Sequence, residues 1–149
     1  MSRYGNAAQT KFKLPDIKSL GLEPRIVGGI IEKYGKVFID SAQQNIQDDT
    51  GNLSRSIGFI EKDSRYKYSA VRLIGARVYA GYKGYHAYIY EHGTVERETK
   101  AGAKRGKMPK SDYMAKSFAL NKDQFLYNVE RDIVKIIEMR ARKAGFIVK

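Results

Sequence analysis

The sequence contains no cysteine, and no apolar run in it approaches the roughly 20 residues that a membrane-spanning helix needs. Without cysteine the chain forms no disulfide and offers no thiolate to a metal, which fits a protein made in a reducing cytoplasm. The N-terminus also lacks the apolar stretch of a secretory signal. We therefore expect a soluble protein that is not exported by the usual route and has no membrane partner.

Acidic residues are missing from three segments, and this determines where the positive charge lies. The chain has 28 basic and 16 acidic residues, a net charge of +12. Residues 1–13, 99–110 and 139–149 hold three, five and four basic residues and no acidic one, which together equal the whole excess. We therefore expect the excess positive charge on the two ends of the chain and on one loop, which are places where proteins commonly bind partners.

The length of 149 residues predicts one domain, with an N-terminal arm over residues 1–23 and a single folded unit over residues 24–149. Pro24 suits the first turn of a helix, where its missing N–H costs nothing. Apolar residues then recur at steps of three and four as far as Ile46. This spacing predicts a helix over about residues 24–47.

The apolar period changes after this helix. Alternating apolar residues predict strands over residues 53–62, 69–79 and 86–92. Residues 95–111 have no apolar period, and they are expected to form an extended basic loop.

Helical spacing returns from Asp112. Asn121 with Gln124 resembles a capping box that begins the long C-terminal helix, and Gly145 fits the C-terminal cap of that helix. The expected fold class is therefore α+β: an antiparallel β-sheet of three to four strands packed against two long helices, with a long basic loop before the C-terminal helix.

Three segments resemble motifs of one known family. They are residues 49–57 (DTGNLSRSI), residues 87–94 (AYIYEHGT) and residues 113–120 (YMAKSFAL), in this order. They resemble the TGxLxxSI, YAxxVExGT and FLxxAL motifs of the minor tail-component and tail-completion proteins, which are encoded in head–tail joining gene clusters of long-tailed bacteriophages. The likeness covers about residues 25–140, with His86 and His92 standing where the family usually has aromatic residues.

The resemblance implies a structural, non-catalytic virion protein at the head–tail junction. Such a protein is a subunit of a ring, expected to be hexameric, that links the capsid portal–connector complex to the tail tube. Its partners would be further copies of itself, neighbouring neck proteins (stopper and connector) and the tail tube protein. DNA passing through the lumen would be contacted without sequence specificity. During assembly the protein would be in the host cytoplasm.

The same motifs supply the candidate site residues. Gly51 offers the left-handed backbone freedom that a helix-to-strand turn requires, and Glu91, flanked by tyrosines, is expected to accept a basic group of a neighbouring subunit. The subunit or partner interface is expected at Thr50, Gly51, Leu53, Tyr88, Tyr90, Glu91, Gly93 and Thr94. The loop residues expected to contact a partner ring or DNA are Lys100, Lys104, Arg105, Lys107 and Lys110. The alternative for this segment is a flexible loop that is simply solvated.

We expect no catalytic residue, no cofactor and no metal. Glu91 and His92 are adjacent on an expected strand, so their side chains point to opposite faces and do not act on one atom. His86 and His92 would share a face but lie about 20 Å apart, too far for one metal ion. The segment Gly81–Gly84 lacks the spacing of a phosphate-binding loop and is interpreted as a turn.

The alternative function is that of a small basic protein that binds single-stranded nucleic acid. Tyrosines are dense between residues 66 and 90, and aromatic residues interleaved with basic ones suit base stacking and phosphate neutralisation. The same tyrosines suit a subunit interface. The interface is favoured because the excess charge lies on the ends and the loop. The residues concerned are Tyr66, Tyr68, Tyr79, Tyr82, Tyr85, Tyr88 and Tyr90.

Overall fold

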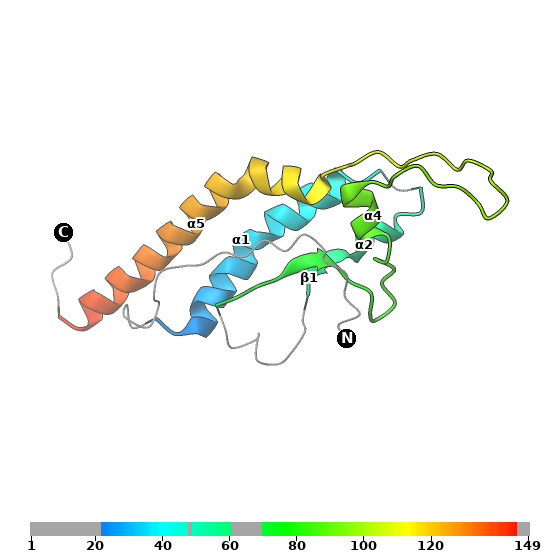
Figure 1. Cartoon of the computed structure of the whole chain (residues 1–149). Coiled ribbons are helices and arrows are strands. Elements are labelled where there is room, and N and C mark those ends of the chain that lie inside the picture. The colour runs from blue at the N-terminus through cyan, green and yellow to red at the C-terminus, as the bar shows by residue number, and fades with distance from the viewer. Residues whose placement is uncertain (1–21, 48, 61–69, 146–149) are drawn as a thin grey trace.

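A computed structural model of the chain describes residues 22–47, 49–60 and 70–145. Two long helices lie side by side, and a small sheet and two short helices lie against them. The extended segment of residues 94–110 projects beyond one end (Figure 1). The expected N-terminal arm, residues 1–23, falls almost wholly outside the described residues, as do Tyr66 and Tyr68.

Helix α1 (Pro24–Gln44) forms where the apolar spacing predicted a helix, with the proline in its first turn. It ends at Gln44 rather than at residue 47, and Asn45 is its C-cap. A Cβ at Gly35 would approach the ring of Phe59 to 3.3 Å, so the glycine lets the sheet pack close to the helix. The apolar residues buried along α1 form one stripe: Val27, Ile30, Ile31, Phe38 and Ala42.

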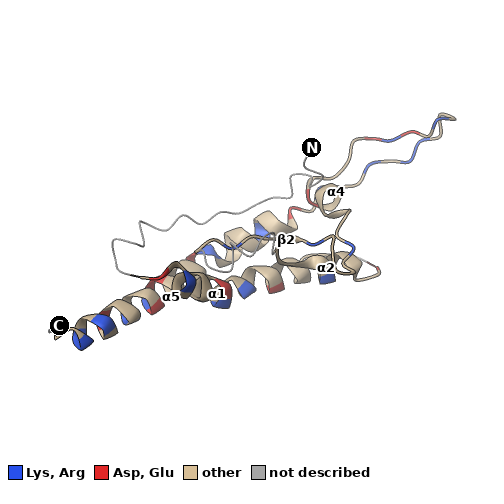
Figure 2. Ribbon diagram, turned by 90° about the horizontal axis from the view of Figure 1, so that it is seen from below, with Lys and Arg blue, Asp and Glu red and all other residues tan. Residues whose placement is uncertain are grey.

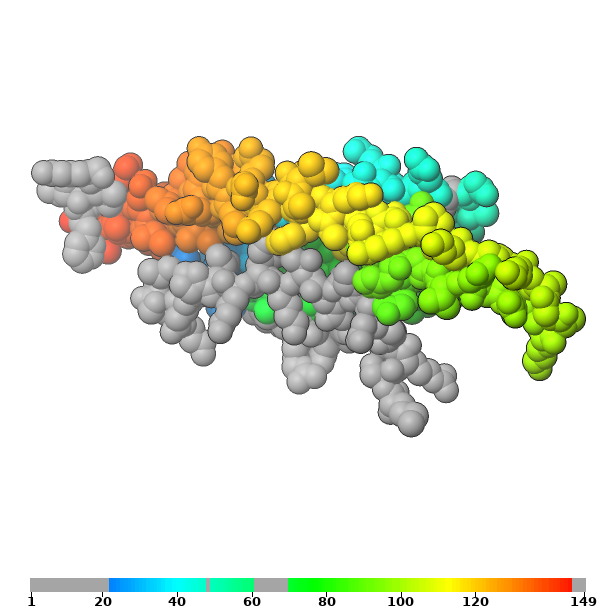
Figure 3. Space-filling model, turned by 45° about the horizontal axis from the view of Figure 1, so that its top comes forward, coloured from blue at the N-terminus to red at the C-terminus, as the bar shows by residue number. Residues whose placement is uncertain are grey.

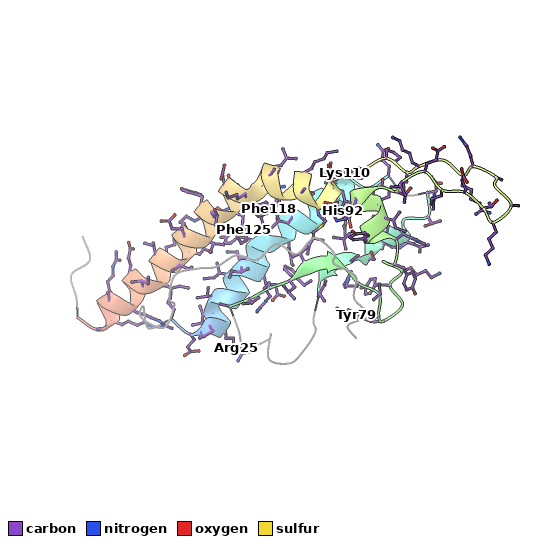
Figure 4. The ribbon with its side chains drawn as sticks, in the orientation of Figure 1. Arg25, Tyr79, His92, Lys110, Phe118 and Phe125 are labelled. Atoms are coloured by element: carbon purple, nitrogen blue, oxygen red, sulfur yellow. The ribbon has the colours of Figure 1, made fainter. Side chains whose placement is uncertain are left out.

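Helix α5 (Tyr113–Lys143) runs without interruption through the position where a capping box was expected, so that prediction is wrong. Asn121 lies inside the helix, and its Nδ2 donates to the carbonyl oxygen of Ser117 at 2.8 Å. Phe118 and Phe125, on either side of Asn121, pack against Phe38 of α1, with ring centroids 5.7 and 5.0 Å away (Figure 4). Because a break would take one ring away from Phe38, tertiary packing keeps the helix continuous.

The two long helices pack antiparallel and form the first core cluster. Asp132 of α5 accepts hydrogen bonds from the Tyr34 hydroxyl at 2.7 Å and from Lys33 Nζ at 3.0 Å, both on α1. These bonds, that of Tyr34 first, lower the pKa of Asp132 to about 2. The buried members of the cluster are Leu22, Val27, Ile30, Ile31, Phe38, Phe125 and Val129.

The sheet is smaller than expected, and the predicted fold class is wrong. Among the described residues it has two short strands, β1 (Ile57–Phe59) and β2 (Ile74–Ala76), instead of three to four. The strands are antiparallel, with Gly58 opposite Gly75 at the centre. The described chain is therefore mostly helical, with one small antiparallel sheet.

Two segments that were expected to be strand form short helices, α2 (Asn52–Ser56) and α4 (Ala87–His92). In α4 the buried residues are Ala87 and Glu91, four residues apart, which is the spacing of one face of a helix. The alternating tyrosines of the same segment fit a strand equally well. Six residues are too few for periodicity to decide between helix and strand, so packing decides.

Candidate functional site

Residues 94–110, here called the arm, form an antiparallel pair of extended segments that projects from the body (Figure 3). At its start, the Thr94 N–H donates to the carbonyl oxygen of Met108 at 3.0 Å. Further out, Glu98 and Lys104 form an isolated antiparallel bridge, and Gly102, with φ +79°, lies in the turn at the tip. The expected loop is therefore a hairpin with its own backbone hydrogen bonds.

The arm is charged and almost wholly exposed. It carries six basic and two acidic residues, a net charge of +4, and Figure 2 shows basic residues along both of its segments. Only Thr94, Thr99 and Met108 are partly buried, while Val95 is 82% exposed. A hairpin that buries so little of itself contributes little to the core, so its side chains are free to meet a partner.

The root of the arm is closely packed. Gly93 has φ +71° and ψ −171°, a conformation adopted essentially only by glycine. A Cβ there would lie 2.7 Å from the carbonyl oxygen of Met108. Next to it, the Thr94 Oγ1 accepts from the Met108 N–H at 2.8 Å. The direction in which the arm leaves the body is thus fixed by a glycine and by paired hydrogen bonds.

Glu91, two residues before Gly93, caps helix α5. The residue is buried, with 4% of its surface exposed. Its two carboxylate oxygens accept hydrogen bonds from the backbone N–H groups of Met114 at 3.0 Å and Ala115 at 3.3 Å. A carboxylate at a helix N-terminus is favoured because it satisfies free N–H groups and opposes the positive end of the helix dipole. Within the chain, Glu91 therefore already has the acceptor role that we expected it to play for a neighbouring subunit.

The three segments that resemble the phage family meet in the second core cluster, directly behind the root. Leu53 comes from the first segment, Ala87 from the second and Tyr113 from the third, and all three are buried. Tyr90 packs against this cluster, and its hydroxyl accepts from the Gln47 N–H at 2.8 Å. Burial, followed by the charge of Glu91, raises the pKa of Tyr113. The three segments thus build one packed unit that holds the arm.

The other predicted interface residues lie at the edge of this unit. Gly51 adopts φ +63°, and with Thr50 it forms the turn before α2, where the Gly51 carbonyl oxygen accepts from the Arg55 N–H at 3.1 Å. Tyr88 is 49% exposed on α4, with its ring centroid 4.6 Å from that of His92. Tyr88 and Thr50 are therefore the exposed members of the predicted set.

The five basic residues that were expected to contact a partner ring or DNA do not form one cluster. Lys110 is bound at the root, where its Nζ lies 2.9 Å from Asp112, and this hydrogen bond raises the pKa of the lysine (Figure 4 labels Lys110). Lys104 is 3.9 Å from Glu96 in an exposed pair, a kind of contact that contributes little to stability. The remaining cations, Lys100, Arg105 and Lys107, are exposed.

Sequence reasoning missed Arg77, which joins the sheet to α2. Its Nε donates to the carbonyl oxygen of Ser56 at 3.0 Å, and its Nη2 donates to that of Arg55 at 3.0 Å. The guanidinium also lies over the Tyr82 ring, 3.6 Å from the centroid. Free carbonyls at the end of a short helix favour a basic partner, but no local pattern identifies a partner more than 20 residues away.

His86 and His92 do not lie on a strand, as was expected when a shared metal site was excluded. Ala87–His92 is helical and His86 is its N-cap, so the two histidines lie about 9 Å apart along the axis instead of about 20 Å. No group of three or more potential metal ligands occurs within residues 22–47, 49–60 and 70–145. In the same part of the chain, no helix is long and apolar enough to cross a membrane.

Comparisons of the chain with models of protein families, with curated proteins and with solved structures gave no match. The family resemblance therefore depends on the three segments and their order.

Proposed function

We propose that this chain is a structural virion protein of a tailed bacteriophage, a ring-forming tail-completion or head–tail connector subunit without catalytic activity. In this role it links the capsid portal–connector complex to the tail tube. The motifs at residues 49–57, 87–94 and 113–120 support the proposal by their resemblance and by their convergence on one packed unit.

The observation that carries the proposal is the projecting arm. A chain that folds alone gains nothing from a charged hairpin with an 82% exposed valine at its start, yet the arm's root is fixed by Gly93, Thr94 and the Glu91 cap. A rigid root with an unburied tip is the arrangement expected of an element that becomes buried only on assembly.

The proposed partners follow from the family resemblance. They are further copies of the chain in a ring, the neighbouring neck proteins and the tail tube protein, with the phage DNA passing through the lumen. The proposed location is the head–tail junction of the virion, after assembly in the host cytoplasm.

The test measures absolute mass by light scattering, with and without purified tail tubes. The wild-type chain should form a ring or bind to tail ends. In a shortened variant, residues 95–107 are replaced by Asn-Gly. Thr94 and Met108 are already paired across the root, and Asn-Gly favours a tight hairpin turn between them. This variant should fold normally, as measured by circular dichroism and thermal unfolding, and fail to assemble.

A matched control changes exposed residues of the body, Lys36→Gln and Asp40→Asn on α1, and should assemble as the wild type does. A wild-type chain that stays monomeric at all concentrations and ignores tail tubes would contradict the proposal.

The second candidate is a protein that binds single-stranded nucleic acid, favoured by the exposed rings of Tyr85 and Tyr88, 65% and 49% exposed. It predicts binding of a DNA oligonucleotide that weakens steeply between two salt concentrations. It also predicts that Tyr85→Ala and Tyr88→Ala weaken this binding. Steep DNA binding by a persistent monomer would favour this function over the ring.

A further inference from the structure

The two segments of the arm are paired so that two arginines lie directly opposite each other. The Arg105 N–H donates to the carbonyl oxygen of Arg97 at 2.7 Å. Glu98 and Lys104, the next residues toward the tip, form the antiparallel bridge. Because successive residues of an extended segment point to opposite faces, the two arginines share one face of the arm and the bridged pair shares the other.

The acidic residues of the arm lie beside Lys104. Glu98 is opposite this lysine, and Glu96 is 3.9 Å from its Nζ. The other face, here called the arginine face, presents Arg97 and Arg105, both of them exposed. Like charges directly opposite in an antiparallel pair destabilise it. The arginine pair therefore does not serve the stability of the arm itself.

Four cations of the arm have no acidic partner within the described residues. Arg97, Lys100, Arg105 and Lys107 are exposed, and none of them forms an ion pair with a described side chain. They are spread along the arm, with Lys100 in the turn at the tip, the arginines further back and Lys107 nearer the root (Figure 2). Cations spread along a projecting element fit a ligand with repeated negative charge better than one carboxylate cluster.

The shape of the arm fits duplex DNA. The major groove of B-DNA is about 12 Å wide and admits a two-stranded ribbon, whose strands are about 4.8 Å apart. Residues 94–100 reach about 20 Å from the root at about 3.3 Å per residue. Each guanidinium presents a planar fork of N–H donors that matches a phosphate group. Two arginines side by side are therefore suited to the phosphates that border the groove.

We propose that the arginine face of the arm binds the phosphate backbone of duplex DNA, with Lys100 and Lys107 adding contacts at the tip and near the root. Phosphate contacts carry no sequence information, so the binding is non-specific and lets the DNA move past the arm. The inference rests on the proposed function for the presence of DNA beside the arm. The opposite face of the arm remains for a neighbouring protein subunit.

The salt dependence of DNA binding tests the contact. Binding of a short fluorescent DNA duplex is measured by anisotropy at several salt concentrations. In an arginine-face variant, Arg97→Gln with Arg105→Gln, the slope of log affinity against log salt should be shallower by about 2, because each phosphate contact contributes about 0.9. At about 0.1 M salt this corresponds to a loss of affinity of roughly 50-fold.

A matched control, Lys104→Gln with Lys110→Gln, removes the same charge from cations that have acidic partners. Lys104 lies opposite Glu98, and the Nζ of Lys110 is 2.9 Å from Asp112. This control should keep the slope of the wild type. An equal decrease of the slope in both variants would show that only the net charge of the arm matters, and it would overturn the arginine face.

A further variant, Arg105→Glu, separates binding from folding. It places a carboxylate opposite Arg97, and opposite charges across an antiparallel pair are favourable. Circular dichroism and thermal unfolding should therefore show no loss of stability, while the affinity for the duplex falls further than in Arg105→Gln. An Arg105→Glu chain that binds the duplex as the wild type does contradicts the proposed contact, as does a wild-type chain that binds no duplex.

The outcomes separate this inference from the proposed function. The arginine-face variant should still form rings or bind tail tubes. If it loses this assembly and keeps its DNA affinity, the face binds an acidic protein surface, which overturns the DNA contact and leaves the ring function standing. Duplex binding with the expected slopes by a chain that ignores tail tubes upholds the contact and overturns the neck function. DNA binding that is lost in Tyr85→Ala and Tyr88→Ala but not in the arginine-face variant overturns the contact.

Discussion

In the body of the molecule, Phe38 and Phe125 are 4% and 2% exposed and pack against each other across the two long helices, whereas in the arm Val95 is 82% exposed. The body uses its apolar residues to fold, because each one buried adds to the stability of the chain. The arm keeps its apolar and charged groups in solvent, and only its root is fixed to the body. The arm therefore costs ordering entropy without burying much surface, and this imbalance is the basis of the binding role proposed for it.

The largest contrast is expected between a core ring and an arm side chain. Phe125→Ala should lower the free energy of unfolding by about 3–5 kcal/mol, because it leaves a cavity against Phe38. Val95→Ala should change it by less than about 0.5 kcal/mol. Urea unfolding of both variants measures the difference. A similar loss in both would mean that the arm is part of the folding core.

The glycines of the root and the tip give the next contrast, since both have positive φ. Gly93→Ala should cost about 3 kcal/mol, because a Cβ adds a clash with the carbonyl oxygen of Met108 to the backbone strain. Gly102→Ala, with no atom within 4 Å of the added Cβ, should cost about 1 kcal/mol from strain alone. Thermal unfolding compares the two variants. Equal losses would show that the root is no more tightly packed than the tip.

Two glutamates five residues apart, Glu91 and Glu96, give a third contrast. Glu91→Ala should cost about 2 kcal/mol, because the N–H groups of Met114 and Ala115 lose their acceptor at the start of α5. Glu96→Ala, on the exposed arm, should be nearly neutral. Urea unfolding measures both, and Glu91→Gln, which keeps one acceptor oxygen, should lie between them.

This third prediction also separates two roles of Glu91. If the unfolding free energy of Glu91→Ala equals that of the wild type while assembly is lost, the residue serves the neighbouring subunit and not the helix cap.

The two long helices were predicted from the sequence better than the short helices and strands were. Pro24 at the start of α1 and Gly145 after the end of α5 were both expected, and both are confirmed. These helix ends were predictable because the fixed φ of proline and the positive φ open to glycine act on the backbone within a single turn. The predicted helix start at Asn121 was wrong, because the local capping pattern stabilises less than the packing of Phe118 and Phe125 on Phe38.

The candidate site shows the same division. Glu91 and Gly93 were singled out from the sequence as interface residues, which stays a prediction, and the structure places both at the root of the arm. The capping role of Glu91 was not predictable, because the N–H groups that it binds lie more than 20 residues later and on an element reached by way of the arm. The segment Ala87–His92 satisfied both periods, so only its contacts with Leu53 and Tyr113 fixed it as a helix.

The smallest expected contrast concerns pH and the two surface ion pairs. The pKa of Asp132 falls from its ordinary 3.8 to about 2, through the Tyr34 hydrogen bond first and Lys33 next. A depressed carboxyl pKa stabilises the fold above the unfolded value, and this contribution is lost as the pH falls from near 3.8 to about 2. Asp132→Asn should therefore flatten the dependence of unfolding on pH in that window, measured by thermal unfolding between about pH 5 and pH 2. Glu96→Gln, which removes the 3.9 Å pair with Lys104, should leave the dependence unchanged. Parallel curves for wild type and Asp132→Asn would mean that the hydrogen bonds to Tyr34 and Lys33 do not persist in solution. The surface charges of the body would then contribute as little to stability as those of the arm.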